Sequence, residues 1–338
     1  MDELKELGRL WADMPEASEQ DLAASRAALL SRAGMPQRPR PRIRFRRPAL
    51  RVGLVGALAT GLSAVIVAAQ VGLLGAGSVA NAQDLLKRAS AAAAGQEELV
   101  PGPGQYVHTK MRVRKNLYTR DKATGKLPLT VVHGNEERWD PADANRPWLM
   151  REQSYAAEGP ALRHLWDRGV VDILHEPSYC PGPRAYARLG DWPSDVGQVR
   201  AKLVAQVGED PLSQWNELKR LVKESVVRPS LSAALYRVVA EVDGIELVPE
   251  VVDVAGRPGM AVAMDEGGGR RSELIFDRST YRYLGERTVN VADVREDTPN
   301  GTITQPKGAT TGTAVLGVEL VPSLPAVSDK VSRMKIPC

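Results

Sequence analysis

The sequence predicts a single transmembrane helix followed by an α+β domain, and three observations support this prediction. An uncharged apolar run fills residues 52–77, strand-like alternation occupies residues 105–174 and 247–291, and a helical period separates the two strand regions. Strands, helices and strands again in this order are typical of an α+β domain. We therefore expect residues 83–338 to form a curved antiparallel sheet with a helical insertion.

The run at residues 52–77 is long enough to cross a membrane, because about 20 apolar residues in a helix span the hydrocarbon layer. Positive residues beside a span stay in the cytoplasm, which predicts a cell-membrane protein with a cytoplasmic N-terminus and an extracytoplasmic domain at residues 83–338. The basic cluster in the Pro/Arg-rich linker, residues 35–51, either gives only this topology signal or also contacts anionic headgroups. It consists of Arg38, Arg40, Arg42, Arg44, Arg46, Arg47 and Arg51.

Two alternatives concern the span itself. Residues 80–82 (Ala-Asn-Ala) have the form of a signal-peptidase site, and Arg46-Arg47 loosely resembles a twin-arginine signal, so the alternative is a leader cleaved after Ala82. The apolar run exceeds the core of a typical leader, which favours a retained anchor. Small residues recur on helical faces of the span, so it either self-associates or carries them by chance in an Ala-rich chain. They are Gly53, Ala57 and Gly61 on one face and Ala64, Ala68, Gly72 and Ala76 on another.

Residues 1–34 are predicted to form a cytoplasmic segment of two short helices, interrupted at Pro15 and ended by Gly34. Helices this short bury little surface between them, so their apolar faces either bind a partner or belong to a short solvated tail. Cys and His are absent before residue 83, which excludes the zinc-binding type of anti-sigma domain. The candidate partner-binding face consists of Leu4, Leu7, Trp11, Leu22 and Leu29.

The distribution of charge argues against a nucleic-acid partner. The chain has 45 basic residues (Lys and Arg) and 41 acidic residues (Asp and Glu). Residues 1–51 hold 11 of the basic and 7 of the acidic residues, and residues 52–83 hold neither kind. Residues 84–338 therefore hold 34 basic and 34 acidic residues. Nucleic-acid binding depends mainly on basic side chains that neutralise phosphates, and a neutral large domain lacks such a surplus.

Periodicity and turn residues predict the elements of the external domain. A helix at residues 84–94 is followed by strands at 105–118, 129–139, 148–152 and 170–174. Helices follow at 195–207 and 211–239, the second broken at Pro229. Strands resume at 247–254, 259–265, 271–277 and 281–291, with a hairpin turn at 266–269. We expect a polar loop at 297–313 and a last edge strand at 316–321.

The sequence carries no recognisable catalytic motif. His108, His133, His164 and His175 lie apart, outside any metal-ligand spacing, and the glycines at 267–269 lack the strand–loop–helix context of a phosphate site. We therefore expect no catalytic residue, no metal and no cofactor. The two cysteines, Cys180 and Cys338, are a candidate disulfide in an oxidising compartment; free thiols or an intermolecular bond are the alternatives.

Several stretches resemble a family of actinobacterial single-pass membrane proteins commonly encoded beside an RNA polymerase sigma factor. They are residues 137–143 (Glu-Arg-Trp-Asp-Pro-Ala-Asp), 233–237 (Ala-Ala-Leu-Tyr-Arg), 273–277 (Glu-Leu-Ile-Phe-Asp) and 281–287 (Tyr-Arg-Tyr-Leu-Gly-Glu-Arg). The resemblance covers most of the chain and implies a regulatory role with a sigma factor, by gene neighbourhood. The 273–277 hairpin is also similar to the half-barrel sheets of lipoprotein carriers and periplasmic anti-sigma co-regulators, a fold-level analogy.

Two functions fit these observations. The first is a membrane-anchored, anti-sigma-like regulator whose external domain senses an envelope state or ligand and whose cytoplasmic helices hold or release a sigma factor. The second is an envelope carrier or binding module for a lipid or other apolar ligand, anchored to the membrane. An apolar concave face on the sheet would favour the second.

Overall fold

A ten-stranded sheet is the framework of the computed structural model, which describes residues 79–121, 124–143, 145–176, 189–329 and 331–335, all within one unit of the chain, Val71–Cys338. The strand order is β12-β4-β3-β2-β1-β11-β8-β7-β6-β5, antiparallel throughout except for the β12–β4 pair. The predicted α+β class with a large antiparallel sheet is confirmed. The strands are β1 Tyr106–Tyr118, β2 Leu129–Pro141, β3 Trp148–Glu158, β4 Val170–Glu176, β5 Ile245–Val252, β6 Pro258–Gly267, β7 Arg270–Asp277, β8 Tyr283–Asn290, β11 Thr310–Val321 and β12 Ser332–Lys335.

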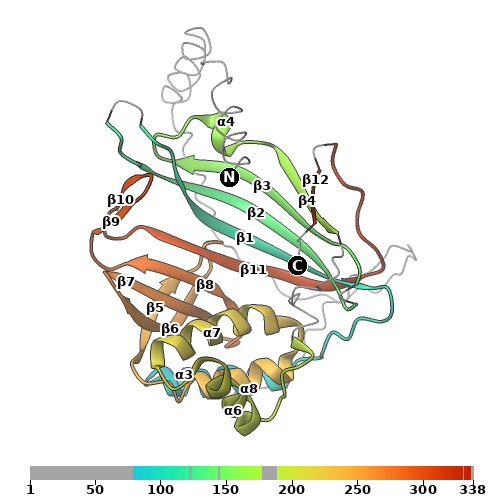
Figure 1. The fold of residues 1–338 in the computed structure, drawn as a ribbon. Coiled ribbons are helices and arrows are strands. Elements are labelled where there is room, and N and C mark those ends of the chain that lie inside the picture. Colours follow the sequence, from blue (N-terminus) through green and yellow to red (C-terminus); the bar gives the residue numbers. More distant parts are fainter. Residues whose placement is uncertain (1–78, 122–123, 144, 177–188, 330, 336–338) are drawn as a thin grey trace, which may run out of the picture. The chain divides into compact units, whose positions relative to one another are not determined.

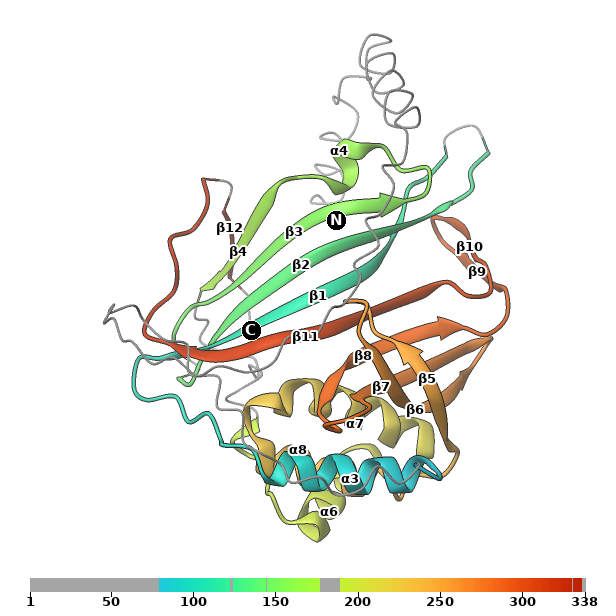
Figure 2. The same cartoon turned by 180° about the vertical axis from the view of Figure 1, so that it is seen from behind.

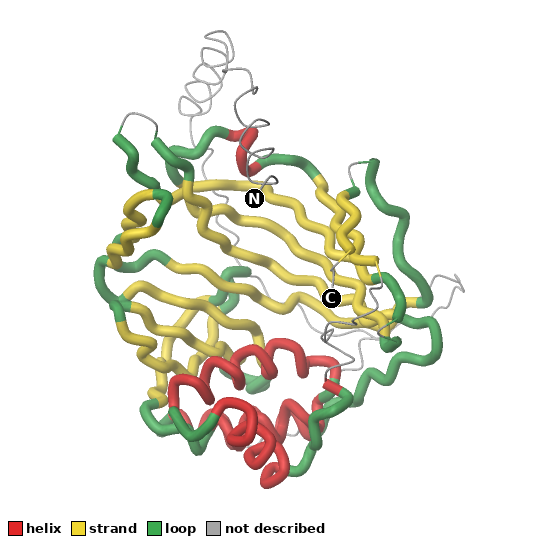
Figure 3. The backbone as a smooth tube through the Cα atoms, viewed as in Figure 1, coloured by secondary structure: helices red, strands yellow, loops and turns green. Residues whose placement is uncertain are grey.

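Helices α3, α6, α7 and α8 gather at the β5–β8 end of this sheet, whereas the short α4 lies beside β3 and the strands from β1 to β12 extend away from the helical cluster (Figures 1, 2 and 3). Most of them come from the predicted insertion between β4 and β5, and α3 precedes the sheet in the chain. The bounds are α3 Ala82–Ala94, α4 Arg163–Trp166, α6 Val196–Val207, α7 Pro211–Glu224, the 3-10 turn η1 Ser225–Val227 and α8 Pro229–Val239.

Local chemistry fixes where these helices begin. The side chains of Asn81, Asp195 and Asp210 each accept a hydrogen bond from a backbone N–H in the first turn of α3, α6 and α7, the usual role of an N-cap residue. Pro211 and Pro229 occupy first turns, where proline has no N–H to lose. The predicted break of the second helix at Pro229 is therefore confirmed.

The main core lies between the helices and one face of β6 and β7. Val262, Met264, Leu274 and Phe276 on the strands pack against buried side chains of α3, α7 and α8. We call this side of the sheet the helix face and the opposite side the outer face. Because side chains alternate along a strand and β1 pairs with β11 and β2, Met111 lies on the helix face, and Lys110, Arg112 and Arg114 lie on the outer face.

Strand β11 corrects two expectations from the sequence. The expected loop at 297–313 holds the end of β9 (Val294–Thr298), the whole of its hairpin partner β10 (Gly301–Gln305) and the first residues of β11. The expected edge strand is central, because β11 pairs with β1 on one side and β8 on the other. Its first residues are Thr-Thr-Gly-Thr, and neighbouring backbone approaches closely at Gly312. This part of the strand therefore lacks the large alternating side chains that alternation rules detect.

After β11, the chain crosses the outer face as an extended segment, Pro322–Asp329, which we call the C-terminal strap. Leu324 packs on a second buried cluster that includes Trp139 and Leu149. The Arg151 guanidinium donates a hydrogen bond to the Ala326 carbonyl oxygen over 2.8 Å and is 2.7 Å from the buried Asp172 carboxylate. The strap thus leads from β11 to β12, which covers the edge of β4.

Candidate functional site

A large hollow of the described domain lies beside α7, where β1 separates from β11. The two strands pair only as far as Arg114 and Gly312. Two adjoining cavities there, of about 380 and 150 Å³, share Asn116, Thr288 and Thr311. We call them together the polar groove. It is lined by Arg114, Lys115, Asn116, Lys219, Arg270, Ser272, Glu286, Arg287, Thr288, Asn290, Gln305, Ala309, Thr310, Thr311, Gly312 and Thr313.

Helix α7 is held over the sheet by one buried hydrogen bond as well as by packing. The Trp215 indole N–H donates to the Ser272 hydroxyl over 2.6 Å, and the Trp215 side chain is fully buried. Leu218, Leu221 and Val222 follow at helical spacing and are also buried. This packing leaves Lys219, on another side of α7, at the wall of the groove.

The lysine side chains of the lining are paired with nearby carboxylates. Lys115 is 2.6 Å from Glu152 and 3.0 Å from Glu136, and Lys219 pairs with Glu266. Burial by itself would lower the pKa of Lys115, but hydrogen bonds with these two carboxylates outweigh burial and raise it. Since the local charges are neutralised, the groove is suited to a ligand recognised by hydrogen bonds more than by net charge.

Three side-chain atoms of the lining are buried and have no hydrogen-bond partner among the described residues: Arg114 Nε, Asn116 Oδ1 and Thr313 Oγ1. The Asn116 side-chain amide is held in place because its Nδ2 donates to the Tyr118 hydroxyl over 3.1 Å. Gln305 Nε2 donates to the same hydroxyl over 2.6 Å. Buried polar atoms in proteins nearly always have partners, so an acceptor and a hydroxyl in one groove indicate a binding site.

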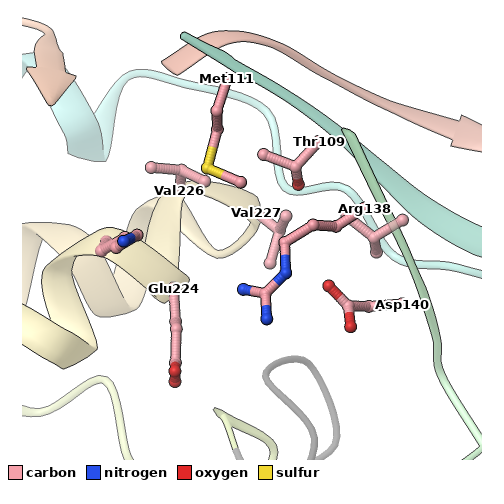
Figure 4. Close-up of a pocket in the computed structure, with 9 residues that line it drawn as sticks. Thr109, Met111, Arg138, Asp140, Glu224, Val226 and Val227 are labelled. Atoms are coloured by element: carbon pink, nitrogen blue, oxygen red, sulfur yellow. The ribbon is translucent and has the colours of Figure 1, made fainter. Parts of the chain in front are cut away.

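A smaller and more apolar cavity lies at the C-terminal end of α7. Figure 4 shows Met111 and Val226 toward one end of it and the charged groups of Arg138, Asp140 and Glu224 toward the other. Its volume is about 30 Å³. A space of this size admits a water molecule but no acyl chain, because ligand pockets typically measure about 300–1,000 Å³.

The site residues predicted from the sequence lie outside the described residues. This holds for the partner-binding face, the basic cluster, the apolar run 52–77 and both cysteines: Leu4, Leu7, Trp11, Leu22, Leu29, Arg38, Arg40, Arg42, Arg44, Arg46, Arg47, Arg51, Cys180 and Cys338. In the part of the chain that the structure describes, no helix is long and apolar enough to cross a membrane.

The structure also gives contacts for three of the histidines. His108 stacks on Trp139 with ring centroids 4.3 Å apart, and its ring nitrogens lie 2.7 Å from Glu137 and 3.1 Å from Glu319. His133 lies 3.0 Å from Glu158, and His175 stacks on Trp148. Within the described ranges, no group of three His, Cys, Asp or Glu side chains has the arrangement of a metal site.

Comparison with known proteins does not assign the chain to a family. The chain matches no family model and no curated protein. Among solved structures, it is similar to a chain of the Pseudomonas aeruginosa MucA/MucB complex, with 16% identity over 72% of this chain and 58% of that chain and a TM-score of 0.22. This chain therefore spans less than two thirds of that neighbour.

A second similar structure is a domain of a putative outer membrane lipoprotein-sorting protein from Vibrio parahaemolyticus, with 12% identity over 72% of this chain and 95% of that one and a TM-score of 0.19. At these TM-scores neither similarity supports an argument about fold or function. The half-barrel expected by analogy with lipoprotein carriers therefore stays a prediction.

Proposed function

We propose that the chain is a membrane-anchored, non-catalytic regulator, anti-sigma-like in its cytoplasmic segment, whose external domain senses an envelope ligand in the polar groove. The observation behind the sensing role is the polar lining with its unpartnered buried atoms, among them Asn116 Oδ1 and Thr313 Oγ1. The ligand is a polar molecule rich in N–H or O–H donors, such as a peptide or a glycan fragment. The cytoplasmic role rests on the resemblance and on the helical face that contains Leu22 and Leu29.

The alternative function, carriage of a lipid, requires an apolar enclosure. Of the two hollows beside α7, the more apolar one at Met111 measures only about 30 Å³, and the larger one is lined by hydroxyl, amide and charged groups. Burying an acyl chain against such groups would leave them without hydrogen bonds, at a cost of about 1–3 kcal/mol for each. A polar ligand therefore fits the domain better than an acyl chain.

Native mass spectrometry of the full-length protein, purified from its own membranes, tests the sensing role. We expect a polar ligand to be retained by the wild type and lost from the Asn116→Leu/Thr313→Val double variant. Ser279→Ala, on an exposed turn, is the matched control and should retain the ligand. Retention of an acylated molecule instead would favour the carrier function.

The cytoplasmic role has a separate test. Full-length protein extracted from membranes is expected to retain a sigma factor, and the Leu22→Glu/Leu29→Glu variant to lose it, because charges on an apolar helical face prevent its burial. If both proteins retain the same set of partners, the helical face has no regulatory role.

A further inference from the structure

A second hollow lies on the outer face, on the opposite side of the sheet from the polar groove. It measures about 280 Å³ and runs over β1, β2 and β3 to the neighbouring strands β4 and β11. Its lining includes Lys110, Arg112, Arg151, Val170 and Leu316. We call it the outer-face groove. It is separate from the ligand site of the proposed function and does not depend on it.

The cations on this face differ in how they are paired. Lys110 is 2.9 Å from Glu319, Arg151 is 2.7 Å from Asp172, and Arg114 is 3.7 Å from Glu158. Arg112 has no carboxylate within ion-pair distance among the described residues; its Nη1 donates to the Tyr155 hydroxyl over 3.0 Å.

The guanidinium of Arg112 is also held in a defined position. Its central carbon lies 5.1 Å from the centroid of the Tyr155 ring, and its Nε is buried without a hydrogen-bond partner in the described part of the chain. A carboxylate stabilises a partly buried arginine, because the guanidinium can donate hydrogen bonds to both carboxylate oxygens at once. The pairing of its neighbours makes Arg112 the cation available for an incoming anion.

Large apolar side chains surround this cation on three strands. Tyr155 on β3 is 47% exposed, Leu316 in the β11 bulge 46%, and Val170 on β4 37%. Leu316 and Val170 line the groove, and Tyr155 contacts Arg112. Exposed apolar groups that cluster around a recognition group are typical of protein-binding surfaces.

We propose that the outer-face groove docks an acidic segment of a partner protein, with one carboxylate on Arg112 and flanking apolar side chains on Leu316 and Val170. The hollow accepts side chains, which favours a peptide over a flat lipid surface. The polar rim of Lys110 and Glu137 sets the orientation of the segment, as charged rims do at other interfaces.

Fluorescence anisotropy tests this docking with full-length protein in nanodiscs of zwitterionic lipid. The probe is a fluorescein-labelled peptide of alternating leucine and aspartate, and its leucine–asparagine counterpart is the control. We expect saturable binding of the aspartate peptide only, weakened about tenfold or more in Arg112→Gln. Arg282→Gln, which removes an exposed arginine in the loop between β7 and β8, should bind as the wild type does, and circular dichroism verifies that both variants are folded.

Three results would overturn the proposal. They are no saturable binding of the aspartate peptide, equal binding of the two peptides, or equal affinity of Arg112→Gln and the wild type. A parallel measurement with phosphatidylglycerol vesicles identifies the other source of anions. If the protein binds these vesicles through Arg112 and does not bind the peptide, the groove contacts lipid headgroups and the partner proposal is wrong.

Discussion

Gly285 lies where β8 closely approaches β11. Its φ of 155° is in the range that favours glycine, and a Cβ at this position would overlap the Thr313 carbonyl oxygen. We expect Gly285→Ala to lower the free energy of unfolding by about 3 kcal/mol, since strain and overlap act together. Gly256→Ala is the control, because Gly256 also has a positive φ but open space around it. If urea denaturation shows that both variants lose the same free energy of unfolding, the steric explanation is wrong.

Thr313 and Ser272 both line the polar groove but differ in their hydrogen bonds. Because the Thr313 hydroxyl has no partner among the described residues, Thr313→Val should leave the free energy of unfolding within about 0.5 kcal/mol of the wild type. Ser272→Ala removes the hydrogen-bond partner of the buried Trp215 indole and should lower the free energy of unfolding by about 1–2 kcal/mol. Urea denaturation measures both. A destabilised Thr313→Val would mean that the hydroxyl serves the fold and not the ligand.

Asp172 makes the stability of the domain depend on acid pH. The hydrogen bond from Arg151 lowers the pKa of the buried Asp172 carboxyl, opposed by burial and assisted by the Ser328 backbone N–H. The folded-state pKa is thus below the unfolded value, so this contribution is present above pH of about 4 and is lost as pH falls through the folded pKa.

We expect Asp172→Asn to lower the free energy of unfolding by about 2–3 kcal/mol at neutral pH. The difference from the wild type should disappear below the folded pKa, when the native carboxyl is protonated as well. Denaturation at pH 7 and at a series of acidic pH values measures this, with the exposed Asp243→Asn as the control. A difference that stays constant with pH would show that charge is not its cause.

At the scale of elements, the register of β12 and β4 bears on the two cysteines. Lys335 is paired with Glu176 in parallel, and Cys338 and Cys180 follow these two residues by three and four positions in the sequence, outside the described residues. We expect the two to form a disulfide, and alkylation of the non-reduced protein to leave its mass unchanged. Cys338→Ser should render Cys180 fully reactive. Labelling of both thiols in the non-reduced wild type would exclude the bond.

The elements that the sequence predicted correctly are those with local signals. Pro229 marks the break between α7 and α8, the glycines at 267–269 mark the β6–β7 turn, and β1 and β2 alternate clearly. Strand β11 was misplaced because pairing with β1 and β8, not its own side chains, determines its position. Strand β12 has four residues and too short a pattern to detect.

At the scale of the whole molecule, the candidate sites were beyond prediction for a related reason. The polar groove brings Asn116 of β1 and Lys219 of α7 together with Thr313 of β11, and none of these residues belongs to a local motif. The outer-face groove likewise depends on the bulge that exposes Leu316. Both sites result from sheet order, which alternation along a single strand does not encode.

The central position of β11 predicts how truncation affects the fold. A chain ended after Val321 loses the strap and β12 but keeps β11 between β1 and β8. We expect it to stay folded and to bind a hydrophobic dye at the uncovered Trp139 and Leu149. A chain ended after Gln305 also loses β11 and should lose cooperative unfolding. Circular dichroism melts measure both, and a cooperative melt of the shorter chain would contradict this account.

The same strand sets the order of events during synthesis. Tyr106 at the start of β1 pairs with Val321, so the two halves of the sheet remain unjoined until nearly the whole chain has been made. Pairings this distant in sequence form slowly, and meanwhile β1 and β8 each present an open edge on which other chains can add. Newly made protein is therefore expected to depend on chaperones until its last strand arrives, and conditions that slow this step should increase its aggregation.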